Sequence, residues 1–141
     1  MNTETSNSSR TIKVGILGFG TVGQGTWKHL EENASFWPKI LGVNLEPSRA
    51  SVRTLDKQRS VEISPQQLTT DSASIVDDAE IDLICELMGG VDEAKELTLR
   101  AFAQGKSVVT ANKALICEHG EELFRAAEKA GVCYGFEASV A

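Results

Sequence analysis

A glycine-rich turn between an apolar run and a helix-like stretch constrains the fold of this chain more than any other feature. The turn is Gly18-Phe19-Gly20-Thr21-Val22-Gly23, preceded by the apolar residues 12–17 and followed by helix-like sequence to residue 32. Gly18 permits a tight turn, Gly20 lets a ligand approach the backbone, and Gly23 lets a helix pack closely on the strand. Free N–H groups at the start of that helix would face phosphate groups. Strand, GxGxxG turn and helix in this order predict a dinucleotide-binding βαβ unit, with a purely structural βα turn as the alternative.

Length, charge and the N-terminal sequence narrow the class of protein. The chain has 141 residues, 41% hydrophobic and 24% charged, which suits one soluble domain with a core of its own. A formal net charge of −6 argues against nucleic acid and anionic membranes as partners, and no apolar run could span a bilayer. Residues 1–10 are polar and lack the apolar segment of a signal peptide. We therefore expect a disordered tail over 1–10, a domain over 11–141 and a cytoplasmic location.

The cysteines and histidines give no sign of a metal site. Cys85, Cys117 and Cys133 are odd in number and lack a CxxC pair, which predicts reduced thiols rather than disulfides. We expect them to be buried structural cysteines, with a reactive thiol as the alternative. His29 and His119 have no partner at ligand spacing, so we expect surface or helix-packing roles for both.

Apolar runs alternate with helical periodicities along the chain. They predict strands at 12–17, 81–87, 107–110 and 132–136, helices at 22–32, 92–104 and 118–130, and a short helix at 72–78 capped by Asp71 or Ser72. The strands lack period-two polarity and are separated by helices, as in a parallel sheet buried on both faces. The sequence thus predicts an α/β fold with a doubly wound, mainly parallel sheet of the Rossmann type.

Two stretches are harder to assign. Phe36-Trp37-Pro38 is expected to end the first helix. Residues 43–55 could form one strand interrupted at Pro47 or two short strands, because proline cannot donate a ladder hydrogen bond. Residues 65–70 are predicted to be a loop.

The carboxyl ends of the predicted strands indicate where a ligand would bind. In a doubly wound sheet the ligand lies in the crevice at these ends. The segments that follow the strands are 18–23, 53–57, 86–90, 110–113 and 137–141. We expect these five segments to line one crevice.

Basic residues gather near the end of the second predicted strand. Arg49, Arg53, Lys57 and Arg59 stand there against a single acid, Asp56. Arginine at this position accommodates the 2′-phosphate of NADP, whereas an acid binds the 2′-hydroxyl of NAD. Arg53 flanked by Lys57 favours NADP. Two alternatives stay open: a solvated basic loop, or a register that makes Glu46 the strand end and favours NAD.

Two further segments carry candidate site residues. Gly89-Gly90 follows a strand, so the backbone could approach the cofactor there, or it is only a helix-entry turn; Glu86 beside it is a surface acid or a binding residue. In Thr110-Ala111-Asn112-Lys113, the lysine could donate a proton or hold an anionic substrate, and the polar neighbours could hydrogen-bond a ribose or carboxamide. A helix-capping loop with an exposed lysine is the alternative.

Four segments together resemble the homoserine dehydrogenases. They are residues 14–23, Cys85-Glu86-Leu87-Met88-Gly89-Gly90, Val109-Thr110-Ala111-Asn112-Lys113-Ala114-Leu115 and Phe136-Glu137-Ala138-Ser139-Val140-Ala141, in the family's order. Ser51-Val52-Arg53 is also similar to the family's second strand, where arginine meets the NADP 2′-phosphate. A generic Rossmann domain would carry only the first segment.

The resemblance implies the NAD(P)-binding domain of an oxidoreductase. The family interconverts L-homoserine and L-aspartate 4-semialdehyde with NADP or NAD, in threonine, methionine and isoleucine biosynthesis. The cofactor-binding residues that it implies are Gly18, Phe19, Gly20, Thr21, Val22, Gly23, Arg53, Lys57, Gly89, Gly90, Thr110, Asn112 and Lys113, of which Lys113 would also be catalytic. It further implies a monovalent cation such as sodium on main-chain oxygens of Glu137 and Val140, and a parent that is a homodimer or larger.

The last matching segment is cut at Ala141, where the family continues into a substrate and dimerisation domain. We therefore expect a fragment that binds the cofactor weakly, turns nothing over and leaves the cation site empty or disordered. One alternative is a non-catalytic nucleotide-binding or sensing Rossmann module. Another is a different semialdehyde or amino-acid dehydrogenase, against which the Thr-Ala-Asn-Lys segment argues.

Overall fold

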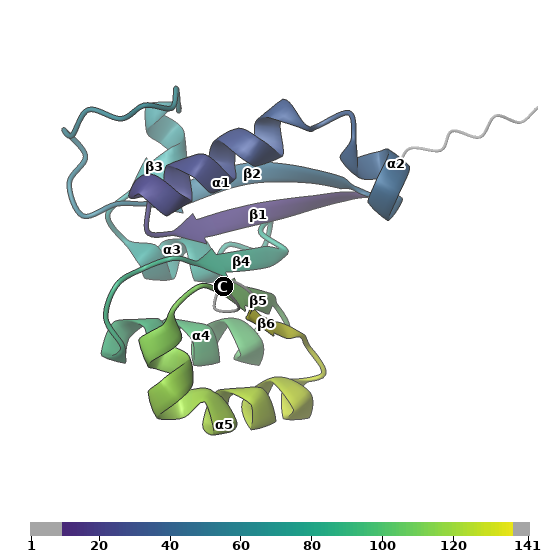
Figure 1. Cartoon of the computed structure of the whole chain (residues 1–141), viewed down its shortest axis with the longest axis vertical. Helices are drawn as coiled ribbons and strands as arrows, with labels where there is room; N and C mark the ends of the chain where they lie inside the picture. Colours follow the sequence, from purple (N-terminus) through teal and green to yellow (C-terminus); the bar gives the residue numbers. More distant parts are fainter. Residues whose placement is uncertain (1–9, 137–141) are drawn as a thin grey trace, which may run out of the picture.

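Six parallel strands form one sheet in the order β3-β2-β1-β4-β5-β6 (Figure 1). The computed structural model describes residues 10–136. The strands are β1 (Thr11–Leu17), β2 (Asn44–Ser51), β3 (Leu68–Thr69), β4 (Leu83–Glu86), β5 (Ser107–Thr110) and β6 (Tyr134–Phe136). The order reverses between β1 and β4, which creates the switch point where such sheets bind ligands. The prediction of a doubly wound parallel sheet is confirmed.

Helices cover the sheet in two layers. They are α1 (Thr21–Glu32), α2 (Trp37–Leu41), α3 (Ser72–Val76), α4 (Asp92–Ala103) and α5 (Lys113–Ala130), with a 3-10 turn, η1, at Pro65–Gln67. Beneath α1, Trp27 packs with Ile16 and Ala50. On the opposite face α3, α4 and α5 enclose a larger core, and Figure 1 shows α4 and α5 together against the β4–β6 half of the sheet.

One continuous strand with a bulge replaces the ambiguous stretch at 43–55. Val14 pairs with Pro47 but Gly15 pairs with Arg49, so Ser48 is an extra residue in β2. A bulge accommodates Pro47, which has no N–H to give to the ladder. The strand ends at Ser51 rather than at residue 55. Glu46 lies inside it, five residues before its end, so the register that makes Glu46 the strand end is wrong.

Other element boundaries differ from expectation for local reasons. After α1 ends, Pro38 at an N-terminal helical position starts α2, where only a helix end was expected. The segment 65–70, expected to be a loop, holds η1 and the short strand β3. Helix α5 begins at Lys113 rather than at residue 118, because Asn112 caps it. The expected cap of α3 is confirmed: Asp71 accepts a hydrogen bond from the Ser74 N–H at 3.3 Å.

The expectation of buried cysteines is wrong. Cys117 and Cys133 are exposed, and Cys85 is half-buried. Burial raises the pKa of the Cys85 thiol to about 11, so this sulfur is a poor nucleophile. Trp27 is fully buried in the core. None of the helices within residues 10–136 is long and apolar enough to cross a membrane.

Candidate functional site

At two positions of the β1–α1 turn, a side chain larger than that of glycine would collide with the backbone. Gly18 has a φ of 96°, and a Cβ there would lie 2.6 Å from the carbonyl oxygen of Leu87. A Cβ on Gly23 would lie 2.1 Å from the carbonyl oxygen of Gly18. A Cβ on Gly20, by contrast, would meet nothing within 4 Å. Gly18 and Gly23 therefore shape the turn, whereas Gly20 leaves open space beside the start of α1.

The N-terminus of α1 has no capping side chain. Its N-cap is Gly20, and its first turn holds no acidic residue. The first N–H groups of a helix have no partner within the helix and attract anions. Thr21 and Val22 are exposed beside them, whereas the ring of Phe19 is buried against Trp27 at a centroid distance of 5.6 Å. Phe19 can thus offer a ligand only its main chain.

A cleft of about 460 Å³ opens directly in front of this helix. Four segments line it: the β1–α1 turn, the loop after β2, residues 70–72 at the start of α3, and the β4–α4 turn. The lining residues include Gly18, Phe19, Gly20, Ser51, Val52, Arg53, Thr54, Lys57, Arg59, Leu87, Met88, Gly89 and Glu93. Three of the five predicted crevice segments thus meet here.

Arg53 and Lys57 bring positive charge into the cleft. Both side chains are exposed, and neither makes an ion pair with another residue in the described part of the chain. Arg59 instead donates to the carbonyl oxygens of Lys57 at 2.8 Å and Leu55 at 3.2 Å. The Ser60 N–H donates to Gln24 Oε1 of α1 at 2.9 Å. Arg59 and Gln24 therefore fold and anchor the loop that presents Arg53 and Lys57.

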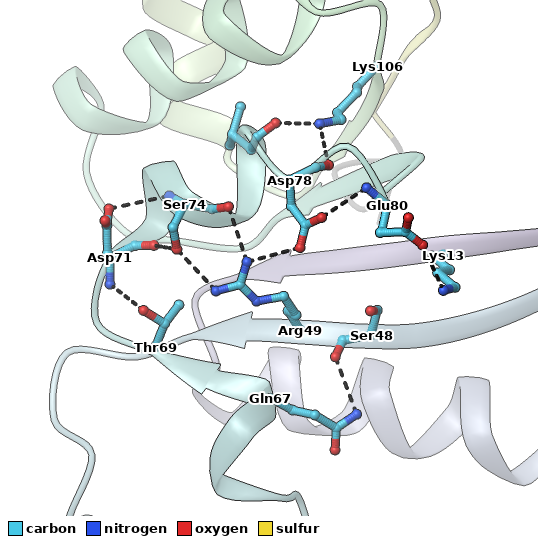
Figure 2. Close-up of polar contacts among 11 residues, drawn as sticks. Lys13, Ser48, Arg49, Gln67, Thr69, Asp71, Ser74, Asp78, Glu80 and Lys106 are labelled. Carbon is cyan, nitrogen blue, oxygen red and sulfur yellow. Dashed lines mark hydrogen bonds and ion pairs between the residues drawn. The ribbon is translucent and has the colours of Figure 1, made fainter.

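Arg49 is not part of this basic group, contrary to its place in the sequence. Its guanidinium donates to Asp78 Oδ2 and to the carbonyl and hydroxyl oxygens of Ser74, each at 3.1 Å (Figure 2). The Glu80 N–H and the Arg49 guanidinium hold the pKa of Asp78 below its usual value. Figure 2 also shows Lys106, which donates to the Asp78 carbonyl oxygen at 2.9 Å. These groups tie β2, α3 and the start of β5 together.

Glu86 is a fully buried carboxylate at the end of β4. Thr110 Oγ1 donates to its Oε1 at 2.6 Å, the Met88 N–H donates to its Oε2 at 3.0 Å, and Asn112 Nδ2 lies 3.5 Å from Oε2. Burial raises the pKa of Glu86, and these three hydrogen bonds oppose that rise. Of the two interpretations of Glu86, that of a surface acid is wrong. The sequence signal for a buried carboxylate was a charged residue next to Ile84 and Cys85 in an apolar strand.

Asn112 joins the β4–α4 turn to α5. Its Nδ2 donates to the Gly90 carbonyl oxygen at 2.7 Å, and its Oδ1 accepts from the Leu115 N–H at 3.0 Å. The 110–113 segment therefore caps helix α5, as the alternative of a helix-capping loop predicted. Lys113 follows as the first residue of α5, exposed and without a side-chain partner among residues 10–136. Gly90, Thr110, Asn112 and Lys113 do not line the 460 Å³ cleft but lie beside its Gly89 wall.

Ser51 is a contributor that the sequence did not single out. Its hydroxyl oxygen accepts a hydrogen bond from the Gly18 N–H at 3.2 Å and another from the Ser72 hydroxyl at 2.8 Å. It thereby fixes the start of the glycine turn to the end of β2. Its one signal in the sequence was its place at the start of the Ser51-Val52-Arg53 segment.

The predicted cation ligands Glu137 and Val140 lie outside the described residues. Within residues 10–136, no three acidic, histidine or cysteine side chains gather as a metal site.

The family whose profile matches this chain is described as "Homoserine dehydrogenase, NAD binding domain", over residues 18–137. Homoserine dehydrogenase from Synechocystis sp. is 44% identical over 130 residues, which cover 92% of this chain and 30% of that protein. This chain thus spans about 30% of the length of that relative.

Solved structures agree with this similarity. The crystal structure of a homoserine dehydrogenase from Thiobacillus denitrificans matches with a TM-score of 0.87 and 46% identity, over 94% of this chain and 30% of that one. A hyperthermophilic archaeal homoserine dehydrogenase in complex with NADPH shares the fold, with a TM-score of 0.72 and 23% identity over 92% of this chain and 44% of that one.

Proposed function

This chain belongs to the homoserine dehydrogenase family as its NAD-binding domain, and from this premise we propose that the cleft binds NADP in preference to NAD. The observation that supports the preference is the pair of exposed, unpaired cations, Arg53 and Lys57, beside the uncapped N-terminus of α1. A 2′-phosphate is a dianion that Arg53 can bind through two parallel hydrogen bonds. The family match does not favour a non-catalytic sensing module.

Each wall of the cleft has its own task in this proposal. The N–H groups at Gly20, Thr21 and Val22 receive the pyrophosphate, because nothing near Gly20 blocks its approach. Arg53 and Lys57 receive the 2′-phosphate. The turn at Gly89 borders the other end of the dinucleotide, whose nicotinamide accepts or donates a hydride when bound.

The residues beside the Gly89 wall would serve the nicotinamide end. We assign Gly90, Asn112 and Thr110 to its ribose and ring, with Thr110 acting through its main chain because its hydroxyl hydrogen goes to Glu86. Lys113 would then stand near the reacting carbonyl of the substrate as the catalytic lysine, where an ammonium can donate a proton or hold a carboxylate. Its exposed position at the start of α5 suits that role.

The activity of a whole protein of this family is part of the same proposal. It would interconvert L-homoserine and L-aspartate 4-semialdehyde in threonine, methionine and isoleucine biosynthesis, in the cytoplasm and as a homodimer or larger assembly. A monovalent cation such as sodium at Glu137 and Val140 rests on the family resemblance alone. The net charge of −6 supports a protein without nucleic-acid or membrane partners.

Calorimetric titration of this chain with NADPH and, separately, NADH tests the assignment of the cleft. We expect NADPH to bind more tightly, and Arg53→Ala to weaken NADPH binding about tenfold to a hundredfold, or about 1.4–2.7 kcal/mol, while NADH binding hardly changes. Arg125→Ala on the outer surface of α5 is the matched control, because it removes the same charge away from the cleft. Equal affinity for both nucleotides would refute the 2′-phosphate assignment, and binding of neither would refute a competent site in this chain.

A further inference from the structure

We propose that Glu86 is a positioning residue that couples the β4–α4 turn of the cleft to the start of α5. This inference rests on the proposed function for its purpose, but its geometry is independent of any ligand. Glu86 and Thr110 are the last residues of the neighbouring strands β4 and β5 and are paired in the sheet. The carboxylate therefore lies between two of the segments that border the site.

The two carboxylate oxygens hold different segments. Oε1 accepts from Thr110 of β5 at 2.6 Å, and Oε2 accepts from the Met88 N–H of the β4–α4 turn at 3.0 Å. The Glu86 carbonyl oxygen adds a third link, from the Ala111 N–H at 3.4 Å. One buried residue thus connects the turn that lines the cleft with the segment that leads into α5.

A second ring of hydrogen bonds closes around Asn112. Its N–H donates to Thr110 Oγ1 at 3.0 Å, and its side chain donates to the Gly90 carbonyl oxygen at 2.7 Å. Thr110 Oγ1 thus accepts from the Asn112 N–H and gives its one hydroxyl hydrogen to Glu86. The three groups that hydrogen-bond to the Glu86 side chain among residues 10–136 are then all donors, and an ionised carboxylate, which accepts at both oxygens, matches them.

Because these partners are donors, the hydrogen-bond network depends on both oxygens of the Glu86 carboxylate. Replacing one oxygen of Glu86 by an amide nitrogen would set a donor against Thr110 or against the Met88 N–H, and a buried mismatch of this kind is costly. Tyr134 of β6 is a titratable group that interacts with Glu86. Burial and the Glu86 charge raise the pKa of Tyr134 to about 12, so its phenol is neutral at neutral pH.

These hydrogen bonds connect the cleft with the start of α5. Met88 and Gly89 line the cleft, whereas Lys113, three residues after Thr110, is the first residue of α5. A nucleotide that shifts the turn at Gly89 would pull on Glu86 through the Met88 N–H, and Glu86 would move Thr110 and Asn112. Occupancy of the cleft would thereby set the position of Lys113.

The decisive measurement follows backbone amide resonances of the unliganded chain as the pH is changed. We expect the amides of Gly89, Gly90, Asn112 and Lys113 to shift together, with one shared midpoint above the ordinary glutamate value. In Glu86→Gln the shared transition disappears, whereas in Glu118→Gln, an exposed control on α5, it remains. Separate midpoints for the turn and for α5, or a shared transition that survives in Glu86→Gln, would overturn the coupling. The wild-type titration decides the question even where Glu86→Gln fails to fold.

A pair of Thr110 variants provides a second, nucleotide-dependent measurement. Thr110→Val removes the donor to Glu86 and Thr110→Ser keeps it, so we expect the valine variant alone to weaken NADPH binding, by about fivefold or more. We also expect NADPH to shift the Lys113 amide in the wild type and in Thr110→Ser but not in Thr110→Val. Equal behaviour of the two variants would contradict the inference. If the wild type binds no NADPH, the proposed function fails, while the ligand-free titration still decides the role of Glu86.

Discussion

Two helices begin at the same edge of the sheet and differ in how their first turns are satisfied. Helix α1 starts at Gly20 without a capping side chain, beside the unpaired cations Arg53 and Lys57. Helix α5 starts at Asn112, whose side chain accepts from the Leu115 N–H and donates to Gly90. The first arrangement leaves donors and charge for an anion, and the second uses its polar groups to hold the backbone in place.

Under the proposed function, this difference separates binding from positioning within one site. The groups proposed to meet the phosphates make no ion pair within residues 10–136, whereas the groups at the start of α5 are bonded to one another around the buried Glu86 carboxylate. Variants at the two helix starts should therefore affect affinity and stability in different proportions.

Gly23→Ala should have the largest effect, because it disrupts the α1 side altogether. The new Cβ would lie 2.1 Å from the Gly18 carbonyl oxygen, so helix and strand must separate, and we expect a loss of about 2–4 kcal/mol in unfolding free energy. Urea denaturation followed by circular dichroism measures it. Gly25→Ala on the same helix, where a Cβ meets nothing within 4 Å, is the control and should stabilise the chain by about 0.5–1 kcal/mol. Similar losses in both variants would contradict the steric argument.

Gly20→Asp would make the start of α1 resemble that of α5. Gly20 already has the extended backbone of an N-cap, so a capping carboxylate should raise the unfolding free energy by a few tenths of a kcal/mol. The same carboxylate would occupy and repel the phosphate position, and we expect NADPH affinity to fall about tenfold or more. Thermal unfolding and calorimetry on one preparation measure both quantities. Unchanged NADPH affinity would show that the N-terminus of α1 is not the pyrophosphate site.

Asn112→Ala is the converse change at α5. Loss of the cap and of the bond to Gly90 should reduce the unfolding free energy by about 1–2 kcal/mol. Because Asn112 does not line the cleft, we expect the adenosine end of NADPH to bind as before, so that affinity for 2′-phospho-ADP-ribose is unchanged. Denaturation and a titration with that nucleotide test the two parts. A loss of affinity for it would contradict the separation of binding from positioning.

Lys57→Ala should have the smallest effect. Its exposed ammonium would act on the proposed 2′-phosphate through solvent, so we expect NADPH affinity to fall about threefold, less than for Arg53→Ala, with no change in stability. Calorimetry at two salt concentrations measures this, with the exposed Lys39→Ala of α2 as the control. A larger effect for Lys57 than for Arg53 would exchange their roles.

Sequence reasoning recovers features that depend on neighbours along the chain. The glycine turn, the capped helix α3 and the doubly wound parallel sheet follow from local spacing and from general rules for parallel sheets. The Glu86 network does not, because its partners Thr110 and Asn112 lie 24 and 26 residues away. Four basic residues looked alike in sequence, yet Arg49 pairs with Asp78 and Arg59 with loop carbonyls, leaving only two for a ligand.

The exposure of the cysteines could not be predicted from the residue type alone. Cys117 lies on the outer face of α5, and Cys133 comes just before the edge strand β6, so both are exposed. A residue type that is usually buried carries no information about which face of an element it occupies. Only the packing of α5 and the position of β6 at the edge decide its exposure.

The bulge at Ser48 decides which side chains at the end of β2 face α1. Before the bulge, the side chain that packs under α1 is Leu45; after it, Ala50 and Val52 do so, and the alternation of the strand has changed from odd to even positions. Deletion of a single residue here would restore the original alternation and exchange the outward and inward residues at the strand end. A one-residue gain or loss at this bulge would therefore change which side chains at the end of β2 face α1, with no substitution in the cleft itself.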